Sequence, residues 1–303
     1  MKKRTVSFLL AFLTLCLCSC GAPQQKSDIL QITATLFPQY DFAREICGNR
    51  AEITLLLPPG MDSHSYEPTP ADMLTLSQAD LFLYTGDTME PWAATLADSV
   101  NGQITDVSEG VRLLSGEDIH AHVEHSHAAA DTDPHIWTNP QNAIIMVENI
   151  CSAVCGLAPE NAEFFRKNAD AYIEELTQLD ADIDAVVKSG RRKKIVFGGR
   201  FAMRYFTERY GLSYDAAYDS CSGEAEPSPS VLTHIIAEMK AEGLPAVYYE
   251  ELSTPRTAKL IAEETGAKML LLHSCHTLAP EEAGETYLSL MRKNLENLKI
   301  GLN

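Results

Sequence analysis

Short apolar runs and amphipathic segments alternate along most of the chain. Buried strands of a parallel sheet consist of nearly continuous apolar residues, whereas amphipathic helices repeat them every three to four positions. We therefore expect strands over 29–37, 51–58, 80–86, 195–199, 212–218, 246–251 and 268–274. Helices are expected over 38–47, 70–79, 140–156, 201–211, 228–243, 255–266 and 283–301. Two of these helices follow a polar cap and begin with proline, after Thr69 and Asn139, which is typical of helix starts.

Residues 157–190 are expected to form one long amphipathic helix. Its apolar positions recur in alternating steps of four and three, at Phe165, Ala169, Tyr172, Leu176, Leu179, Ile183 and Val186. This is the strongest helical period in the sequence. A helix of about 30 residues would extend roughly 45 Å, enough to link two halves of a protein.

The alternation on both sides of this segment indicates an α/β fold. Strand–helix–strand units favour parallel sheets, and the chain is long enough to form two cores. We expect two parallel-rich α/β lobes, an N-terminal one over 29–156 and a C-terminal one over 191–303, joined by one long rigid helix. Ligands bind beyond the carboxyl ends of such strands, so a site is expected in the cleft between the lobes.

Residues 1–19 are typical of a secretory signal peptide. A basic start precedes an apolar run from Val6 to Leu17, which is too short for a stable membrane span. The letters LCSC, ending at Cys20, resemble a bacterial lipobox, which implies cleavage before Cys20 and its lipidation. Residues 20–28 then form a polar tether. We expect an exported protein, lipid-anchored on the outer face of the cytoplasmic membrane; an ordinary secreted protein is the alternative.

The chain is strongly acidic. It has 24 lysines and arginines against 42 aspartates and glutamates, for a net charge of −18, and the predicted leader is basic. Such a surface repels nucleic acid and anionic lipid headgroups, so no nucleic-acid partner is expected. The charge suits a protein that meets cations, although solubility alone explains it equally well.

Isolated histidines lie where a ligand is expected. His64 follows the strand over 51–58, His135 precedes a capped helix, and His273 and His276 follow the apolar run KMLLL. Neutral imidazole suits zinc, copper, nickel or iron, whereas shells of oxygen alone suit magnesium or calcium. One such histidine is more often a structural residue. Three loops from both halves of the chain favour a transition-metal site.

Two segments carry a specific family resemblance. LLPPGMDSHSYEPTPADMLTLSQADLFLYTG and DPHIWTNPQNA closely resemble the substrate-binding lipoproteins of zinc and manganese ABC importers, the metal-binding cluster A-I family. The likeness covers essentially the whole mature chain. It implies a protein that captures a divalent metal between its lobes and delivers it to an ABC permease with an ATPase partner. It also implies that His64 and His135 are metal ligands.

The other two ligand positions depart from the common family pattern. Arg200 stands where His or Glu is usual, and a guanidinium cannot ligate a cation, so it either pairs with a carboxylate or marks a rebuilt site. His276 stands where Asp or Glu is usual. We expect His64, His135 and His276 to bind zinc, with water, Glu or Asp as the fourth ligand. Manganese is the alternative metal.

Further residues are candidates for the metal or for contacts that support its ligands. Three could ligate directly: His273, Cys275 and Cys221. The two cysteines could equally be small buried hydrophobes or form a disulfide. Metal-bound histidine usually donates its other ring N–H to a carboxylate or carbonyl. The candidate carboxylates are Glu67, Asp133, Glu250 and Glu251.

A second, weaker metal site is expected in the histidine-rich segment 117–133. Its imidazoles lie among alanines and polar residues without an apolar period: His120, His122, His125 and His127. The resemblance implies a flexible loop that captures metal weakly and passes it to the cleft. A solvated loop without a ligand is the alternative.

A zinc hydrolase is the competing function class, because three histidines and one open position also describe catalytic zinc sites. Such enzymes need a general base and often carry His-Glu-x-x-His, which this sequence lacks. Gly-x-Ser-x-Gly and Walker motifs are absent as well. We expect a binding protein and not an enzyme. A surface adhesin has no motif in its favour.

Overall fold

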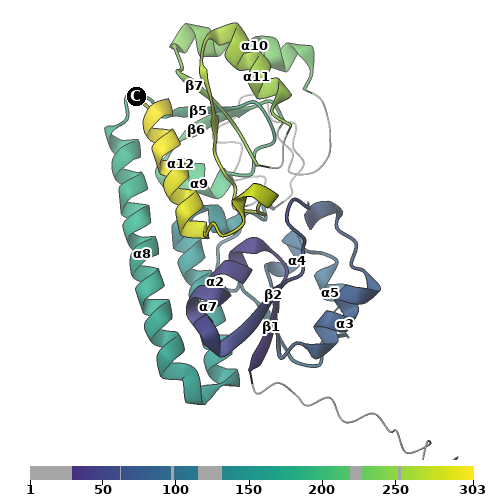
Figure 1. Cartoon of the computed structure of the whole chain (residues 1–303). Helices are drawn as coiled ribbons and strands as arrows, with labels where there is room; N and C mark the ends of the chain where they lie inside the picture. Colours follow the sequence, from purple (N-terminus) through teal and green to yellow (C-terminus); the bar gives the residue numbers. More distant parts are fainter. Residues whose placement is uncertain (1–28, 62, 97–98, 115–131, 219–226, 252–253) are drawn as a thin grey trace, which may run out of the picture.

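The computed structural model describes residues 29–61, 63–96, 99–114, 132–218, 227–251 and 254–303. It contains two α/β lobes, one above the other in Figure 1. Each lobe holds a parallel sheet, with strand order β2-β1-β3-β4 in the N-terminal lobe and β6-β5-β7-β8 in the C-terminal lobe. The expected fold class is confirmed. Within the described ranges, no helix is both long and apolar enough to cross a bilayer.

Most predicted elements of the N-terminal lobe form where apolar runs indicated them. Its strands are β1 (Leu30–Ala34), β2 (Ala51–Leu55), β3 (Leu81–Tyr84) and β4 (Gln103–Asp106). Its helices are α2 (Phe37–Cys47), α3 (Pro70–Gln78), α4 (Gly86–Met89), α5 (Ala93–Leu96) and α7 (Pro140–Leu157), with short 3-10 turns η1 (Gly48–Arg50), η2 (Ser63–Ser65) and η4 (Ile136–Thr138). The caps at Thr69 and Asn139 form, each side chain accepting a backbone N–H of the first turn.

The C-terminal lobe repeats the alternation. Its strands are β5 (Lys194–Phe197), β6 (Ser213–Ala216), β7 (Ala246–Tyr249) and β8 (Lys268–Leu271). Its helices are α9 (Arg204–Tyr210), α10 (Pro229–Glu242), α11 (Arg256–Thr265) and α12 (Tyr287–Gly301), with a 3-10 turn η6 (Pro280–Glu282). The α9 helix begins later than the predicted 201, because the backbone of Met203 is not helical; residues 201–203 are buried in the loop before it.

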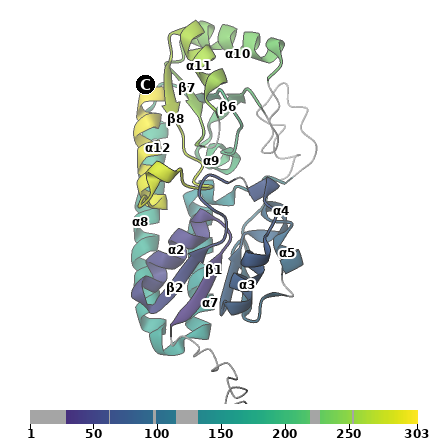
Figure 2. The ribbon, with the colours of Figure 1, turned by 45° about the vertical axis from the view of Figure 1, so that its right-hand side comes forward.

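The long helix α8 (Ala162–Ser189) runs along both lobes (Figure 1). It begins after residue 157, because Pro159–Asn161 form the separate 3-10 turn η5. Its buried face follows the predicted period as far as Ile183, after which Val187 rather than Val186 is the buried residue. In Figures 1 and 2, α12 lies along the part of α8 beside the C-terminal lobe.

One hydrophobic cluster is shared by the two lobes. It contains Ile32 of β1 and Phe197 of β5, and it includes the buried faces of α2, α7, α8 and α12. Two smaller clusters lie on the outer sides of the sheets, one around Phe82 and one around Val247. The lobes are therefore joined by side-chain packing as well as by α8.

Asp180 ties α8 to its neighbours through polar contacts. Its carboxylate accepts hydrogen bonds from Gln141 Nε2 of α7 (2.9 Å), Arg209 Nε of α9 (3.0 Å) and the Tyr210 hydroxyl (2.9 Å). Burial raises the pKa of Asp180, but Arg209 and Tyr210 outweigh it and the pKa is lowered. The carboxylate is thus held in its charged form between helices of both lobes.

One strand and two α-helices of the N-terminal lobe were not predicted: β4, α4 and α5. β4 is an edge strand whose sequence, QITD, lacks the apolar run that marks the other strands. The helices α4 and α5 have four residues each, too few to display a helical period.

A buried carboxyl, Glu90, joins the ends of the central strands. Its oxygens accept hydrogen bonds from the Thr35 hydroxyl after β1, from Gln39 Nε2 of α2 and from the Thr85 amide after β3, the last at 2.9 Å. Burial raises the pKa of Glu90 to about 8, although these hydrogen bonds lower it in part. At neutral pH the carboxyl is therefore mainly protonated.

This raised pKa predicts a pH-dependent loss of stability. The unfolded chain releases the Glu90 proton near 4.5, whereas the native protein holds it up to about 8. The contribution of Glu90 to folding stability is therefore full below its unfolded pKa of 4.5 and is lost as the pH rises through its native pKa of about 8. The loss is at most about 1.4 kcal/mol per pH unit. Glu90→Gln should flatten this slope in urea unfolding between pH 5 and 8. Glu174→Gln, at an exposed position of α8, is the control. An unchanged slope in Glu90→Gln would contradict the assignment.

Candidate metal centre

Three imidazoles from three separate loops converge between the lobes. His64 lies in η2 beyond β2, His135 lies directly before η4, and His276 lies in the loop beyond β8. Their ring centroids are 5.6 to 5.8 Å apart. One ligand atom from each ring lies within 4.8 Å of the other two. His135 and His276 are buried and His64 is half-buried.

His135 is oriented by a carboxylate on its own loop. Asp133 Oδ1 accepts the backbone N–H of His135 (2.8 Å) and lies 3.0 Å from its Nδ1. Burial raises the pKa of Asp133, but the contacts with His135 and with Arg204 outweigh it and lower the pKa. A charged Asp133 favours the tautomer with the proton on Nδ1. The Nε2 lone pair is then available to a ligand, as in the carboxylate–histidine pairs of metal sites.

The loop that carries His276 has an unusual backbone. Cys275 has φ 59°, the only positive φ at a non-glycine residue among the described residues. This conformation is costly for an L residue and persists only where surrounding contacts enforce it. Glu251 supplies such contacts by accepting the backbone N–H groups of Ser274 (2.8 Å) and His276 (3.2 Å). Cys275 is thus buried in the shared core, whereas His276 lies in the imidazole cluster.

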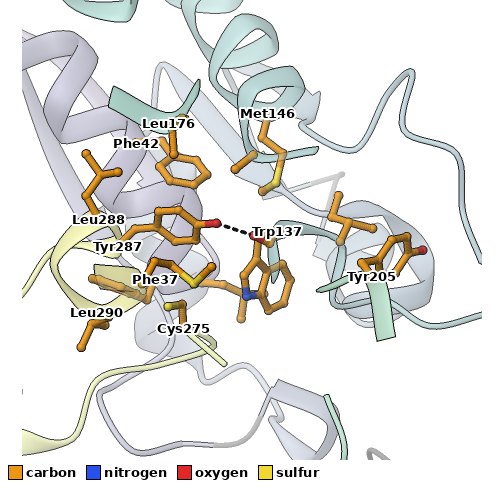
Figure 3. Packing of buried hydrophobic residues seen from close by; sticks show 14 of the residues in the cluster. Phe37, Phe42, Trp137, Met146, Leu176, Tyr205, Cys275, Tyr287, Leu288 and Leu290 are labelled. Atoms are coloured by element: carbon orange, nitrogen blue, oxygen red, sulfur yellow. Dashed lines mark hydrogen bonds between the residues drawn. The ribbon is translucent and has the colours of Figure 1, made fainter. Parts of the chain in front are cut away.

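Trp137 supports this loop from the other lobe. Its Nε1 donates to the Ser274 carbonyl (2.7 Å), and its own carbonyl accepts the Tyr287 hydroxyl (2.6 Å), drawn as a dashed line in Figure 3. The indole meets the His276 ring edge-on, with centroids 5.8 Å apart. Sequence reasoning missed this role. The position of Trp137 two residues after His135 was the one available signal.

Cys275 and His273 are not part of the imidazole cluster. Cys275 is fully buried in the shared core, near Phe37 and Trp137 in Figure 3. His273 Nδ1 accepts the Cys275 N–H (2.9 Å), and its Nε2 lies 3.2 Å from Glu282. Both ring nitrogens are thus engaged within the C-terminal lobe.

Arg200 pairs with a carboxylate, which is the first of the two alternatives that the sequence left open. Its Nε donates to Glu250 Oε1 at 2.8 Å. Burial and then Glu251 raise the pKa of Glu250, and Arg200 and His135 lower it, with a result of about 7. Neither residue contributes a ligand atom within 4.8 Å of all three imidazoles.

The remaining candidates are placed as follows. Glu251 binds the backbone of the His276 loop, as described above, and Glu67 is exposed. The candidates outside the described residues are Cys20, Cys221, His120, His122, His125 and His127.

Near the cluster, the Gly60 N–H donates to Thr277 Oγ1 (3.1 Å), a contact between lobes that the sequence did not indicate.

Two proteins named for zinc binding or zinc uptake match the chain over most of its length. It is 33% identical to the zinc-binding lipoprotein AdcA of Streptococcus pneumoniae, over 99% of this chain and 61% of that protein. It is 30% identical to the high-affinity zinc uptake system protein ZnuA of Bacillus subtilis, over 99% of this chain and 98% of that protein. The chain spans 56% of the length of the AdcA proteins of Streptococcus pyogenes that it matches.

Solved structures match the fold as well. The Zn(II)-bound ZnuA-like domain of Streptococcus pneumoniae AdcA has a TM-score of 0.76 and 31% identity, covering 90% of this chain and 99% of that one. The metal-dependent lipoprotein YcdH of Bacillus subtilis has a TM-score of 0.77 and 29% identity, covering 90% and 99%. A family model described as "ZnuA: Zinc-uptake complex component A periplasmic" matches residues 32–301. With its two parallel sheets and its convergent imidazoles, the chain belongs to this family of zinc-uptake components.

Proposed function

We propose that this protein captures a divalent transition metal, zinc in preference to manganese, outside the cytoplasm and delivers it to an ABC permease. The convergence of His64, His135 and His276 carries the proposal. Two nitrogens that share one zinc ion, each about 2.1 Å away, lie at most about 4.2 Å apart. The observed limit of 4.8 Å requires only a small inward rotation of the rings.

The donor set supports zinc over manganese. Three neutral imidazoles without a carboxylate in the cluster suit zinc, whereas manganese favours oxygen ligands. The AdcA and ZnuA relatives are named as zinc-binding and zinc-uptake proteins, which points the same way. Water or a nearby carboxylate would complete a tetrahedral shell. Manganese specificity is the alternative within the family.

Transport accounts for the site better than hydrolysis does. A catalytic zinc needs an open position with a general base beside its water. Two acids near His135 are instead engaged elsewhere: Asp133 lies against His135 Nδ1, and Glu250 is paired with Arg200. The ZnuA relative is named as part of an uptake system. We therefore infer a binding component that hands its ion to a permease driven by an ATPase, anchored to the membrane through lipid on Cys20.

Metal analysis tests this function. Protein produced without an affinity histidine tag, stripped of metal and then offered equal zinc and manganese, should retain one zinc ion per chain. His276→Ala, prepared in parallel, should retain none. Retention of manganese in place of zinc would overturn the metal assignment, and retention of neither would overturn the function.

Deleting residues 120–127 should slow zinc acquisition without weakening the cleft site. These residues hold the four histidines of the predicted capture loop, whereas the cleft ligands come from three other loops. Stopped-flow mixing with a fluorescent zinc indicator would measure the rate, and equilibrium competition would measure the affinity. A deletion that removes tight binding would mean that the roles of the two sites are reversed.

A further inference from the structure

Three cysteines outside the metal centre lie together where α2 and α7 pack. Cys151 and Cys155 are one turn apart on α7, and their Sγ atoms are separated by 3.9 Å. Both are half-buried and pack against the core cluster that contains the fully buried Cys47. All three are free thiols. The half-exposed pair is accessible from solvent, and nothing in the proposed transport function uses it.

A disulfide does not fit this pair while α7 is intact. Side chains four residues apart on a helix have Cβ atoms about 5–6 Å apart, whereas a disulfide needs about 3.5–4.5 Å. A shared ion does fit. Two sulfurs that each lie about 2.3 Å from one ion can be up to about 4.6 Å apart, and the observed separation is 3.9 Å. The pair is better suited to bridging an ion than to closing on itself.

The environment of the thiols favours a soft cation. Burial and then the neighbouring Cys155 raise the pKa of Cys151 to about 12. Burial also raises the pKa of Cys47 to about 12. Thiols that stay protonated at neutral pH react slowly with oxidants. A hard cation does not displace their protons, whereas a soft ion forms sulfur bonds strong enough to do so, which is the preference of thiolate ligands.

We propose that Cys151 and Cys155 form a second cation site, selective for a soft, thiophilic ion such as Cu(I). Binding releases one proton from each thiol and places the ion between the two sulfurs, with no change in oxidation state. The site is separate from the cleft. Cys151 lies about three turns into α7, roughly 17 Å from its start at Pro140, and His135 precedes that start.

Anaerobic titration of the metal-free chain with Cu(I), in competition with a colorimetric Cu(I) chelator, tests the proposal. Cys151→Ser and Cys155→Ser should each lose one tightly bound Cu(I) per chain together with its sulfur-to-copper charge-transfer absorbance. His64→Ala should keep both. The two cysteine variants should still bind zinc, which also reports that they are folded; Cys151→Ala and Cys155→Ala serve if a serine variant does not fold.

The outcomes separate this site from the cleft. Cu(I) binding that persists unchanged in Cys151→Ser and Cys155→Ser overturns the second site and leaves the transport function untouched. Cu(I) that is lost in His64→Ala but kept in both cysteine variants overturns it too, because the ion then binds to the imidazoles. Zinc binding lost in His64→Ala, with Cu(I) retained, supports two independent sites.

Discussion

His64→Ala is expected to abolish tight zinc binding, and His135→Ala should do the same. Each change removes one of three nitrogen donors that lie within 4.8 Å of one another. Loss of a contact that merely supports a ligand typically costs 10- to 100-fold in metal affinity, so loss of a ligand should cost more than about a hundredfold. Competition of the metal-free protein against a zinc chelator of known affinity, at neutral pH, measures the effect.

His234→Ala is the matched control for these variants. His234 lies on α10, and its side chain is 58% exposed, so its removal should leave zinc affinity unchanged. Thermal unfolding of each metal-free variant would establish that the fold is intact. Wild-type affinity in His64→Ala would show that the tight site lies elsewhere and would contradict the three-histidine centre.

Trp137→Ala should have the largest effect on stability and should also weaken zinc binding. The indole is fully buried in the shared core, and replacing such a side chain with alanine costs about 3–5 kcal/mol. The change also removes the donor to the Ser274 carbonyl, which holds the loop that carries His276. Urea unfolding of the metal-free protein measures the first effect, and zinc competition measures the second.

Trp137→Phe separates packing from hydrogen bonding. Phenylalanine keeps most of the ring volume but lacks the Nε1 donor. The loss of folding stability should therefore be smaller than in Trp137→Ala, whereas the loss of zinc affinity through the His276 loop should persist. A loss below about 1 kcal/mol in Trp137→Ala would contradict a central packing role, because ordinary surface substitutions reach only about half that value.

Much of the fold was predictable because its strands are buried and its helices are amphipathic. Apolar runs located β1 and β3, and the period of α8 was visible over most of its length. The edge strand β4 was missed because its sequence, QITD, carries no apolar run, whereas β8 was found through its apolar run although its side chains are equally exposed. Pattern reasoning detects apolar runs, and a strand without one escapes it.

The candidate site was predictable in part for a similar reason. The strand-end rule and the family resemblance selected His64, His135 and His276, and the structure brings these together; their role as ligands stays a prediction. His273 and His276 lie in different surroundings because the backbone between them is left-handed at Cys275. The sequence does not reveal this conformation, because it depends on a contact with Glu251, which is distant in sequence. Arg200 was left with two alternatives because its partner Glu250 is 50 residues away.

For the transport function proposed above, the apolar cluster common to both lobes would limit how a bound ion leaves. A wide hinge opening would expose that cluster to water, at about 2.5 kcal/mol for each 100 Å² of apolar surface. By contrast, the contact between Gly60 and Thr277 beside the imidazoles is a single hydrogen bond at 3.1 Å. In the proposed transport function, the least expensive exit would therefore be a local retraction of the loop that carries Gly60, and a receiving permease would displace a few residues rather than separate the two lobes.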